Sequence, residues 1–260
     1  MEDKTTLIVS GVARSGTTAL AELLNAHPAV CVGIERFKFR YLLENRYDPG
    51  FFGRTRFFDF QQGDTNLRPE ARPAWKPVYE RIAEKWDEAA VIGDKVPDLT
   101  PVLGDMLDAL PEARCLYILR NLKDVGLSWQ ARADRTRDTW PAGKGFAAAC
   151  ESWAAQQEQL QDLLRARPDL KSRFLLIDYD RIYLEDTPAE AAILNFLGVP
   201  RHRTFARTFA KHRAFIAQKT PRRIPEALVA AYKTVDMTTA RGLRKEARRQ
   251  TAHWARAGRT

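Results

Sequence analysis

A short glycine-containing segment near the start of the chain, Gly11-Val-Ala-Arg-Ser-Gly-Thr-Thr18, has the spacing of a phosphate-binding loop. Such a loop directs backbone N–H groups and the N-terminus of the following helix at an anion. A lysine usually follows the second glycine and neutralises the terminal phosphates of a nucleoside triphosphate. Thr17 stands at that position here. The segment therefore predicts an anion site that differs from an ordinary ATP site.

Arg14 supplies a cation from another position in the same loop. Its planar guanidinium can bind two oxygens of a phosphate or sulfate at once. Thr17 and Thr18 add hydroxyl and backbone donors at the start of the helix, and Ser15 and Gly16 complete the loop. The alternative interpretation is a simple helix N-cap beside an incidental arginine.

A second candidate anion site is the segment Arg120-Asn-Leu-Lys-Asp-Val-Gly-Leu-Ser128, which follows an apolar run. Arg120 is expected at the end of a strand, and Ser128 follows it by about two helical turns. A loop that doubles back would bring both side chains to one anion. Taken alone, the same pattern is also that of a solvated surface pair.

Five short apolar runs are predicted to be strands, and helical patterns alternate with them. The strands are expected at residues 7–9, 30–34, 91–96, 114–119 and 174–177, and helices at about 146–164 and 188–197. Another helix is expected to open at Thr100, as N-cap, and Pro101. This alternation indicates an α/β fold with a mostly parallel sheet flanked by helices. In such sheets ligands bind beyond the carboxyl ends of the strands.

The composition of the 260 residues, 45% hydrophobic and 29% charged, favours one soluble α/β domain over a disordered chain. No apolar run approaches the roughly 18–20 residues of a membrane span, and the first residues do not resemble a signal peptide. The three cysteines, Cys31, Cys115 and Cys150, are widely spaced, and the four histidines do not cluster. We therefore expect no metal site, buried thiols at Cys31 and Cys115, and a reducing, cytoplasmic location.

Two segments stand apart within this predicted domain of residues 1–260. Residues 48–80 are rich in aromatic side chains and prolines, and they form either a lid over an acceptor site or a flap packed on the core. The chain from Arg201 is basic and shows little periodicity before Pro225. The net charge of +9 implies anionic partners, but by itself it leaves nucleic acid, a nucleotide and an acidic substrate open.

Together, the two anion-binding segments resemble those of the sulfotransferases that use 3′-phosphoadenosine 5′-phosphosulfate (PAPS). In that family a P-x-SGTT-type loop holds the 5′-phosphosulfate, and an arginine with a serine eight residues later holds the 3′-phosphate. Residues 13–18 and 120–128 match both motifs in order, and Leu176-Ile-Asp-Tyr179 also looks like the family. The resemblance covers about residues 5–200. It implies a P-loop-like sulfotransferase fold and PAPS as co-substrate without a metal.

The resemblance also implies roles for individual residues. The loop residues from Arg14 to Thr18 would hold the phosphosulfate, with Arg14 also acting in catalysis, and Arg120 and Ser128 would hold the 3′-phosphate. Glu35 follows the second predicted strand, where family members that sulfate sugars or protein side chains have an acidic base. It would take the acceptor's proton.

A glutamate needs a raised pKa for efficient proton transfer, and burial of Glu35 would provide it. Arg36, Lys38 and Arg40 would oppose that rise if they point inward, and simple ion pairing of Glu35 is the alternative. Lys95 ends the third strand, where the resemblance implies a lysine facing the transferred group; a solvated lysine is the alternative.

The family's late basic loop around the 3′-phosphate has no clear match, and Lys219 and Arg223 are the candidates for it. Ala19 stands where an aromatic residue often follows the loop, so no adenine-stacking residue is assigned. The predicted function is sulfuryl transfer from PAPS to a hydroxyl of a carbohydrate or other small molecule. A small-molecule kinase with a degenerate loop and a basic nucleic-acid-binding protein are the alternatives, although no groove-reading motif is present.

Overall fold

The computed structural model describes residues 4–136, 140–184 and 187–257. In these parts of the chain, one parallel sheet has the strand order β2-β3-β1-β4-β5. The strands are β1 (Thr5–Ser10), β2 (Val30–Ile34), β3 (Val91–Lys95), β4 (Arg114–Leu119) and β5 (Phe174–Asp178). All residues of β2, β3 and β5 are buried, as expected for a sheet covered on both faces. The predicted strands and their parallel arrangement are confirmed.

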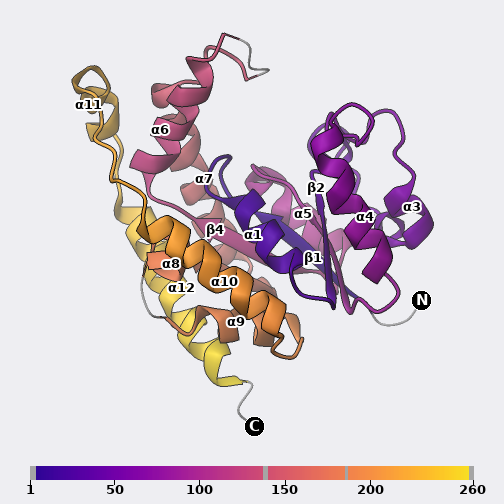
Figure 1. Ribbon diagram of the computed structural model, residues 1–260. Coiled ribbons are helices and arrows are strands. Elements are labelled where there is room, and N and C mark those ends of the chain that lie inside the picture. Colours follow the sequence, from indigo (N-terminus) through magenta and orange to yellow (C-terminus); the bar gives the residue numbers. More distant parts are fainter. Residues whose placement is uncertain (1–3, 137–139, 185–186, 258–260) are drawn as a thin grey trace.

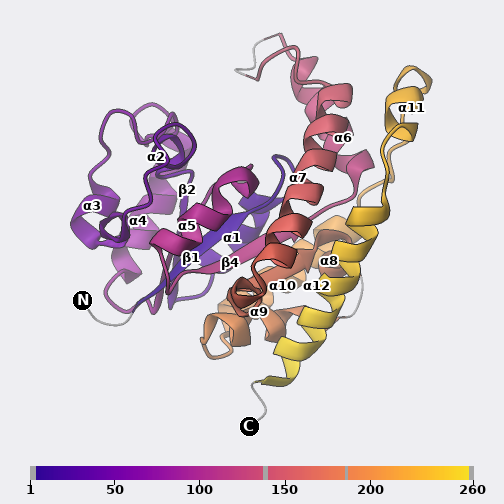
Figure 2. The same cartoon turned by 180° about the vertical axis from the view of Figure 1, so that it is seen from behind.

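Helices cover the two faces of the sheet. One face is covered by α1 (Thr17–Asn25), α8 (Tyr179–Leu184), α9 (Ala189–Leu197) and α10 (Arg203–Ala217), several of which lie in front of the sheet in Figure 1. The other face carries α5 (Leu103–Ala109), α7 (Phe146–Ala166) and α12 (Thr238–Ala257), seen in Figure 2. Two further helices, α6 (Leu122–Ala133) and α11 (Glu226–Lys233), project together from one end of the molecule.

Alternate residues of each strand point to opposite faces. Ile8 and Tyr117 therefore pack with α5 and α7, whereas Leu7 and Leu116 pack with α1 and α9. The cysteines are free and buried, as expected for Cys31 and Cys115. Among the described helices, none has the length and apolar character needed to cross a membrane.

Predictions for the helices were right where the turn chemistry is strong. The helix expected at 188–197 is α9, and it ends at Gly198 in the left-handed conformation (φ 72°). The prediction of Thr100 as an N-cap is wrong. Its hydroxyl instead bonds with Tyr117 Oη (2.7 Å) and Gln156 Oε1 (3.0 Å). A short 3₁₀ turn, η3 (Thr100–Val102), begins there before α5.

The basic segment after Arg201 contains three helices, α10, α11 and α12, which its weak periodicity did not predict. The buried face of α12 consists largely of small or polar side chains, including Ala240, Ala247 and Gln250, so its apolar signal is weak. Gln250 Oε1 accepts a hydrogen bond from Leu176 N of the edge strand β5 (2.8 Å).

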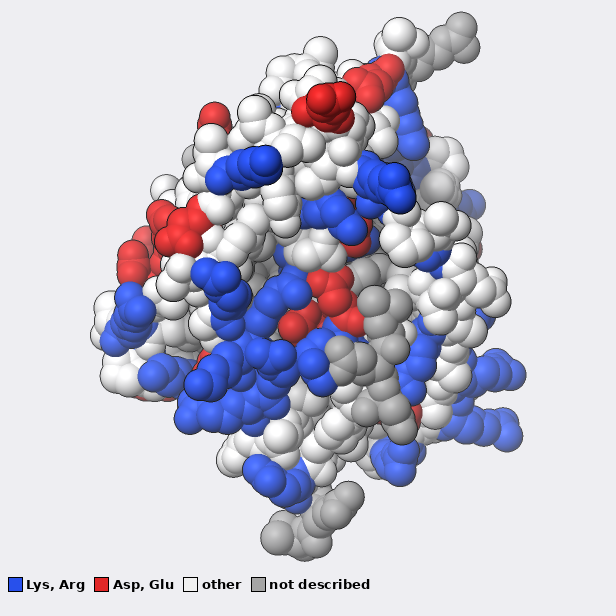
Figure 3. Space-filling model, turned by 90° about the vertical axis from the view of Figure 1, so that its left-hand side faces the viewer, with Lys and Arg blue, Asp and Glu red and all other residues white. Residues whose placement is uncertain are grey.

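On one side of the molecule, Lys and Arg side chains surround a small acidic group (Figure 3).

Residues 48–80 fold against the sheet rather than extending from it. They form η1 (Pro49–Phe52), α3 (Arg54–Phe58), η2 (Pro73–Trp75) and the start of α4 (Lys76–Lys85), with α2 (Lys38–Leu42) next to them. Phe51 and Phe57 are buried, and Phe51 stacks on Phe37 with ring centroids 4.4 Å apart. These aromatic side chains therefore belong to the hydrophobic core.

A buried carboxylate fixes this segment. Asp64 is fully buried and accepts hydrogen bonds from Arg36 Nη1 (2.7 Å), Arg56 Nη2 (2.5 Å) and Arg40 Nε (3.0 Å). Burial alone would raise the pKa of Asp64, but bonds from Arg56, Arg36 and Arg40 outweigh it and hold the pKa well below its usual range. These three arginines thus serve the interior of this segment.

We predict that Asp64→Ala destabilises the protein by about 3–5 kcal/mol, because it leaves the fully buried Arg36 without its carboxylate. Denaturant-induced unfolding measures the effect. The control is Asp87→Ala: Asp87 has an 80% exposed side chain paired with Arg54, and its loss should cost about 0–1 kcal/mol. Equal losses in the two variants would contradict the assignment.

Candidate functional site

The strand order creates a crevice at the carboxyl ends of β1 and β4. The chain leaves β1 towards β2 and β3 on one side, whereas β4 leads to β5 on the other. Ligands of parallel α/β sheets bind at such a switch point. Ser10 of β1 pairs with Tyr117 of β4, so the loop after Ser10 lies beside the residues after Leu119. The topology therefore brings the two predicted anion-binding segments together.

Two glycines shape the first loop. Gly11 has φ 147°, and a Cβ there would lie 2.5 Å from Ile118 O. Gly16 has φ 104°, and its Cβ would lie 2.5 Å from the ring of Tyr179. Gly16 is also the N-cap of α1 and makes no side-chain cap. The first-turn N–H groups of a helix lack intrahelical acceptors, so those of α1 remain suited to an anion.

Arg14 joins the two segments. Its Nε donates to Ser128 Oγ (3.1 Å), and its carbonyl oxygen accepts from Arg120 Nη1 (3.2 Å). Arg14 itself has φ 72°, a conformation uncommon outside glycine. Ser128 lies on α6, so a helix carries it to this position and the expected loop that doubles back is wrong.

Two buried polar atoms at this crevice lack a hydrogen-bond partner among the described residues: Ser15 Oγ and Arg120 Nε. Ser15 is 1% exposed. The Arg120 guanidinium lies 4.3 Å from the ring centroid of Tyr179, and Nη2 is 3.5 Å from Asp124 Oδ2. Buried polar groups are normally satisfied, so these two atoms fit an anionic ligand.

Two tryptophans hold the backbone of these segments, and the sequence did not single them out for this role. Trp129 Nε1 donates to Ala13 O (2.9 Å), and Trp153 Nε1 donates to Arg120 O (3.0 Å). Both indoles are buried. The position of Trp129 directly after Ser128 is the feature of the sequence that could have indicated this role.

Glu35 follows β2 with φ 52° and its N–H donates to Lys95 O (2.7 Å). Its carboxylate accepts from Lys95 Nζ (3.0 Å) and Lys38 Nζ (2.8 Å). Burial alone would raise the pKa of Glu35, but Lys95 and Lys38 outweigh it and hold the pKa below its usual value. The expected rise is therefore wrong, and Lys38 opposes it as anticipated, whereas Arg36 and Arg40 bind Asp64 instead.

Lys95 is only 2% exposed, so the alternative of a solvated lysine is wrong. The preceding residue, Asp94, holds the turn that carries Glu35: its carboxylate accepts from Arg36 N (2.8 Å) and Phe37 N (2.9 Å). Burial raises the pKa of Asp94 to about 6. Neighbouring residues of β3 thus position Glu35 through both its side chain and its backbone.

The two candidates in the late basic loop differ in position. Lys219 is largely exposed and lies near the Arg120 guanidinium of the second segment; partial burial and this neighbouring charge lower its pKa. Arg223 is exposed, and the preceding Arg222 is the residue that donates from Nη2 to Asp124 O (3.4 Å). Arg222 was not among the residues expected from the sequence.

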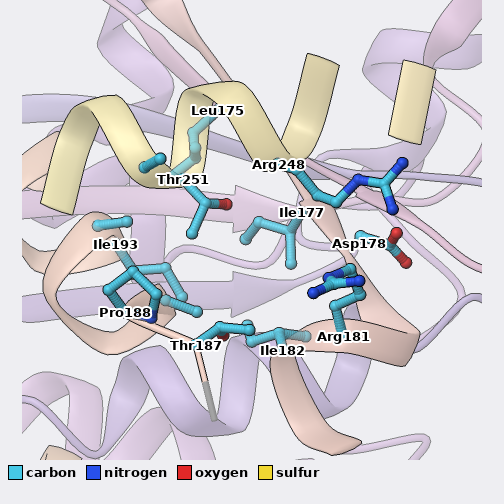
Figure 4. Close-up of a pocket in the computed structure, with 13 residues that line it drawn as sticks. Leu175, Ile177, Asp178, Arg181, Ile182, Thr187, Pro188, Ile193, Arg248 and Thr251 are labelled. Atoms are coloured by element: carbon cyan, nitrogen blue, oxygen red, sulfur yellow. The ribbon is translucent and has the colours of Figure 1, made fainter. Parts of the chain in front are cut away.

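A separate cavity of about 160 Å³ lies between β5, α8, α9 and α12 (Figure 4). Apolar side chains such as Ile177, Ile182 and Ile193 line one side, and Asp178 and Arg248 lie at the other. None of the site residues proposed from the sequence lines this cavity.

A model of the sulfotransferase family matches residues 7–203, from within β1 to the start of α10, and this range includes both anion-binding segments. The chain belongs to the sulfotransferase family. The resemblance drawn from residues 13–18 and 120–128 is thereby confirmed, and the protein is an enzyme of the transferase class.

Two solved structures share the fold of this sulfotransferase. The sulfotransferase domain from the curacin biosynthetic pathway is 15% identical, with 94% of this chain and 97% of that domain aligned and a TM-score of 0.51. Sulfotransferase STF1 from Mycobacterium tuberculosis is 18% identical, with 89% of this chain and 77% of that protein aligned and a TM-score of 0.51. The predicted P-loop-like α/β fold is confirmed. No curated protein matches the chain in sequence.

We predict that Lys38→Met raises the pKa of Glu35, because one of the two ammonium groups that stabilise its ionised form is removed. The stability contributed by ionised Glu35 is present above its unfolded-state pKa and is lost as pH falls through the folded value. That loss should be smaller in the variant and complete at a higher pH, because the folded-state pKa lies closer to the unfolded one. Titration of the Glu35 carboxyl carbon by NMR measures the shift.

The control for this titration is Lys76→Met. Lys76 is an exposed lysine 3.9 Å from Glu80, and its replacement should leave Glu35 unchanged. A pKa of Glu35 that is the same with and without Lys38 would contradict the ion pair.

Proposed function

We propose that this sulfotransferase moves the sulfuryl group of PAPS to a hydroxyl of a carbohydrate or another small molecule. One observation carries the proposal: Ser15 Oγ and Arg120 Nε are buried, lack partners among the described residues, and lie on two segments that Arg14 joins. A donor with two separate anionic groups, as in PAPS, suits such a double site. Family membership supports the same reaction.

The loop from Arg14 to Thr18 holds the 5′-phosphosulfate in this proposal. Gly16 keeps the loop close to Tyr179, and the open N–H groups of α1 face the anion. Arg120 and Ser128 hold the 3′-phosphate, with Lys219 as a further donor near Arg120. Arg223 stays a weaker candidate for this group than Arg222, which reaches Asp124 O.

Glu35 and Lys95 act at the acceptor side. The donor supplies an activated sulfuryl group, and transfer to a hydroxyl needs an acceptor for the hydroxyl proton. Glu35 is ionised at neutral pH, because Lys95 and Lys38 lower its pKa. The Lys95 ammonium has three donors, so its bond to Glu35 leaves others to stabilise charge on the oxygen that leaves. The chemistry assigned to these residues needs no metal.

The proposed acceptor class rests on two points: the acidic base Glu35, and the lack of a basic surface formed by the nearby arginines. Arg36, Arg40 and Arg56 bind Asp64 inside the protein, so they do not form a basic acceptor surface. This supports a carbohydrate or other alcohol, and it gives no support to a nucleic-acid partner. The three free cysteines accord with the reducing, cytoplasmic location that completes the proposal.

Adenosine 3′,5′-bisphosphate should raise the melting temperature of the protein without added metal, whereas ATP with Mg²⁺ should not. Ligand at about 100 times its dissociation constant stabilises a folded protein by about 2.7 kcal/mol. Thermal unfolding followed by circular dichroism compares the two ligands and a short DNA duplex. Stabilisation by ATP and Mg²⁺ would indicate a kinase, and salt-sensitive binding of the duplex would indicate a nucleic-acid-binding protein.

Glu35→Gln should lower turnover by about 10²–10⁴-fold, the usual effect of losing a general base. Binding of adenosine 3′,5′-bisphosphate should stay unchanged, as measured by calorimetry. Glu44→Gln is the matched control, because Glu44 is a partly exposed glutamate that pairs with Arg40. Full activity of the Glu35 variant would exclude Glu35 as the base.

A further inference from the structure

Asp98, which lies in neither of the two anion-binding segments, contacts the phosphate loop at two points. Its N–H donates to Gly11 O (2.9 Å), and its Oδ1 accepts from Ala13 N (2.8 Å). Asp98 therefore binds the backbone of the loop on both sides of Val12. Asp98 lies just after β3, which is the neighbour of β1 in the sheet. The loop after β1 is therefore bound by a residue from the adjacent strand's connection.

The conformation of Asp98 is unusual for its residue type. Its φ of 61° lies in the left-handed region, as does the φ of 72° at Arg14 in the loop that it binds. Residues other than glycine keep such conformations only where their surroundings determine them, and these positions cluster at functional sites. Arg14 has this conformation in the loop, and Asp98 has it in the segment that binds the loop. Together they indicate that the loop is held in a single conformation.

Buried hydrogen bonds connect this contact to the rest of the fold. Asp98 Oδ1 also accepts from Gln156 Nε2 of α7 (2.9 Å), and Gln156 Oε1 accepts from Thr100 Oγ1 (3.0 Å). Thr100 Oγ1 is 2.7 Å from Tyr117 Oη of β4. Gln156, Thr100 and Tyr117 are 6%, 4% and 0% exposed. Because these three partners of Asp98 are buried and hydrogen-bonded, this set of hydrogen bonds resists rearrangement.

These hydrogen bonds fix one residue of the loop, Ala13. The N–H of Ala13 is bound by Asp98, and its carbonyl oxygen is bound by Trp129 Nε1 (2.9 Å). With both polar backbone groups of Ala13 held, the direction of the following residues, Arg14 and Ser15, is fixed. Arg14 then reaches Ser128, and Ser15 Oγ stays buried without a partner among the described residues.

We propose that Asp98 is a positioning residue, whose carboxylate holds the phosphate loop in its anion-binding shape before the donor arrives. The inference rests on the proposed function, because it treats the loop as the site of the phosphosulfate. A loop that had to be ordered on binding would reduce the donor's apparent affinity. Asp98 acts through Ala13 and does not itself touch the donor.

Two substitutions separate the carboxylate from the backbone conformation. Asp98→Asn keeps an oxygen that can accept from Ala13 N and Gln156 Nε2, and asparagine tolerates a positive φ. Asp98→Gly also tolerates the positive φ, but it removes the acceptor. Asn45→Gly is the control, since Asn45 is an exposed residue that also has a positive φ (48°), and its replacement tests the effect of added glycine flexibility.

The measurement is the affinity for adenosine 3′,5′-bisphosphate by calorimetry, with folding checked by circular dichroism. We expect Asp98→Gly to bind about tenfold or more weakly, as for the loss of a hydrogen bond to a charged group. Asp98→Asn and Asn45→Gly should bind within a few-fold of the unchanged protein. If Asp98 had only a structural role, Asp98→Gly would lower the stability of the fold, and the affinity would not differ between Asp98→Gly and Asp98→Asn.

The outcomes distinguish the two proposals. If the unchanged protein does not bind adenosine 3′,5′-bisphosphate, the proposed function itself fails. If it binds and Asp98→Gly binds equally well, or Asp98→Asn binds as weakly as Asp98→Gly, the role of Asp98 is overturned. Should Asp98→Gly not fold, Gln156→Glu gives the same test, because it replaces the donor to Asp98 Oδ1 with a repelling carboxylate. Unchanged affinity in that variant would equally overturn the role.

Discussion

The ring of Tyr179 lies between the two halves of the anion site, and the geometry of both halves depends on it. The ring is so close to Gly16 that no side chain fits there, and it lies under the Arg120 guanidinium. A flat aromatic surface can support a cation and accept close approach of a backbone at the same time. Tyr179 directly follows β5, so the edge of the sheet sets the distance between the loop after β1 and the residue after β4.

The net charge of +9 overstates the positive charge available to ligands. Asp64 binds three arginines in the interior, and Glu35 binds Lys95 and Lys38. These pairs serve different ends. Around Asp64 one fully buried carboxylate binds three guanidinium groups, and these bonds fix the aromatic segment to the core. At Glu35, Lys38 is 28% exposed and Lys95 has further donors, so the same kind of pairing leaves reactive groups within reach of a substrate.

The sequence predicted the parts of the structure that local chemistry determines. Strands with continuous apolar runs, the loop from Gly11 to Thr18 and the helix stop at Gly198 all depend on neighbouring residues. Contacts that depend on distant residues were not predictable in this way. The bond from Trp129 to Ala13 spans 116 positions, and the one from Ala13 to Asp98 spans 85. The direction of the pKa shift of Glu35 also required the packing, because Lys95 lies 60 positions away.

A low pKa at Glu35 constrains how this sulfotransferase can work. An ionised carboxylate held by two ammonium groups is a weak base, so it gains little by removing a proton before the sulfur–oxygen bond forms. Its fixed position, set by Asp94 on the backbone and Lys95 on the side chain, serves to orient an acceptor hydroxyl. Glu35 then takes the proton as the sulfur–oxygen bond forms, and alignment and charge stabilisation by Lys95 and Arg14 supply the rest of the rate enhancement. The loop after β1 and Glu35 after β2 are both held by residues on or just after β3, the strand between them, and such catalysis depends on this fixed placement.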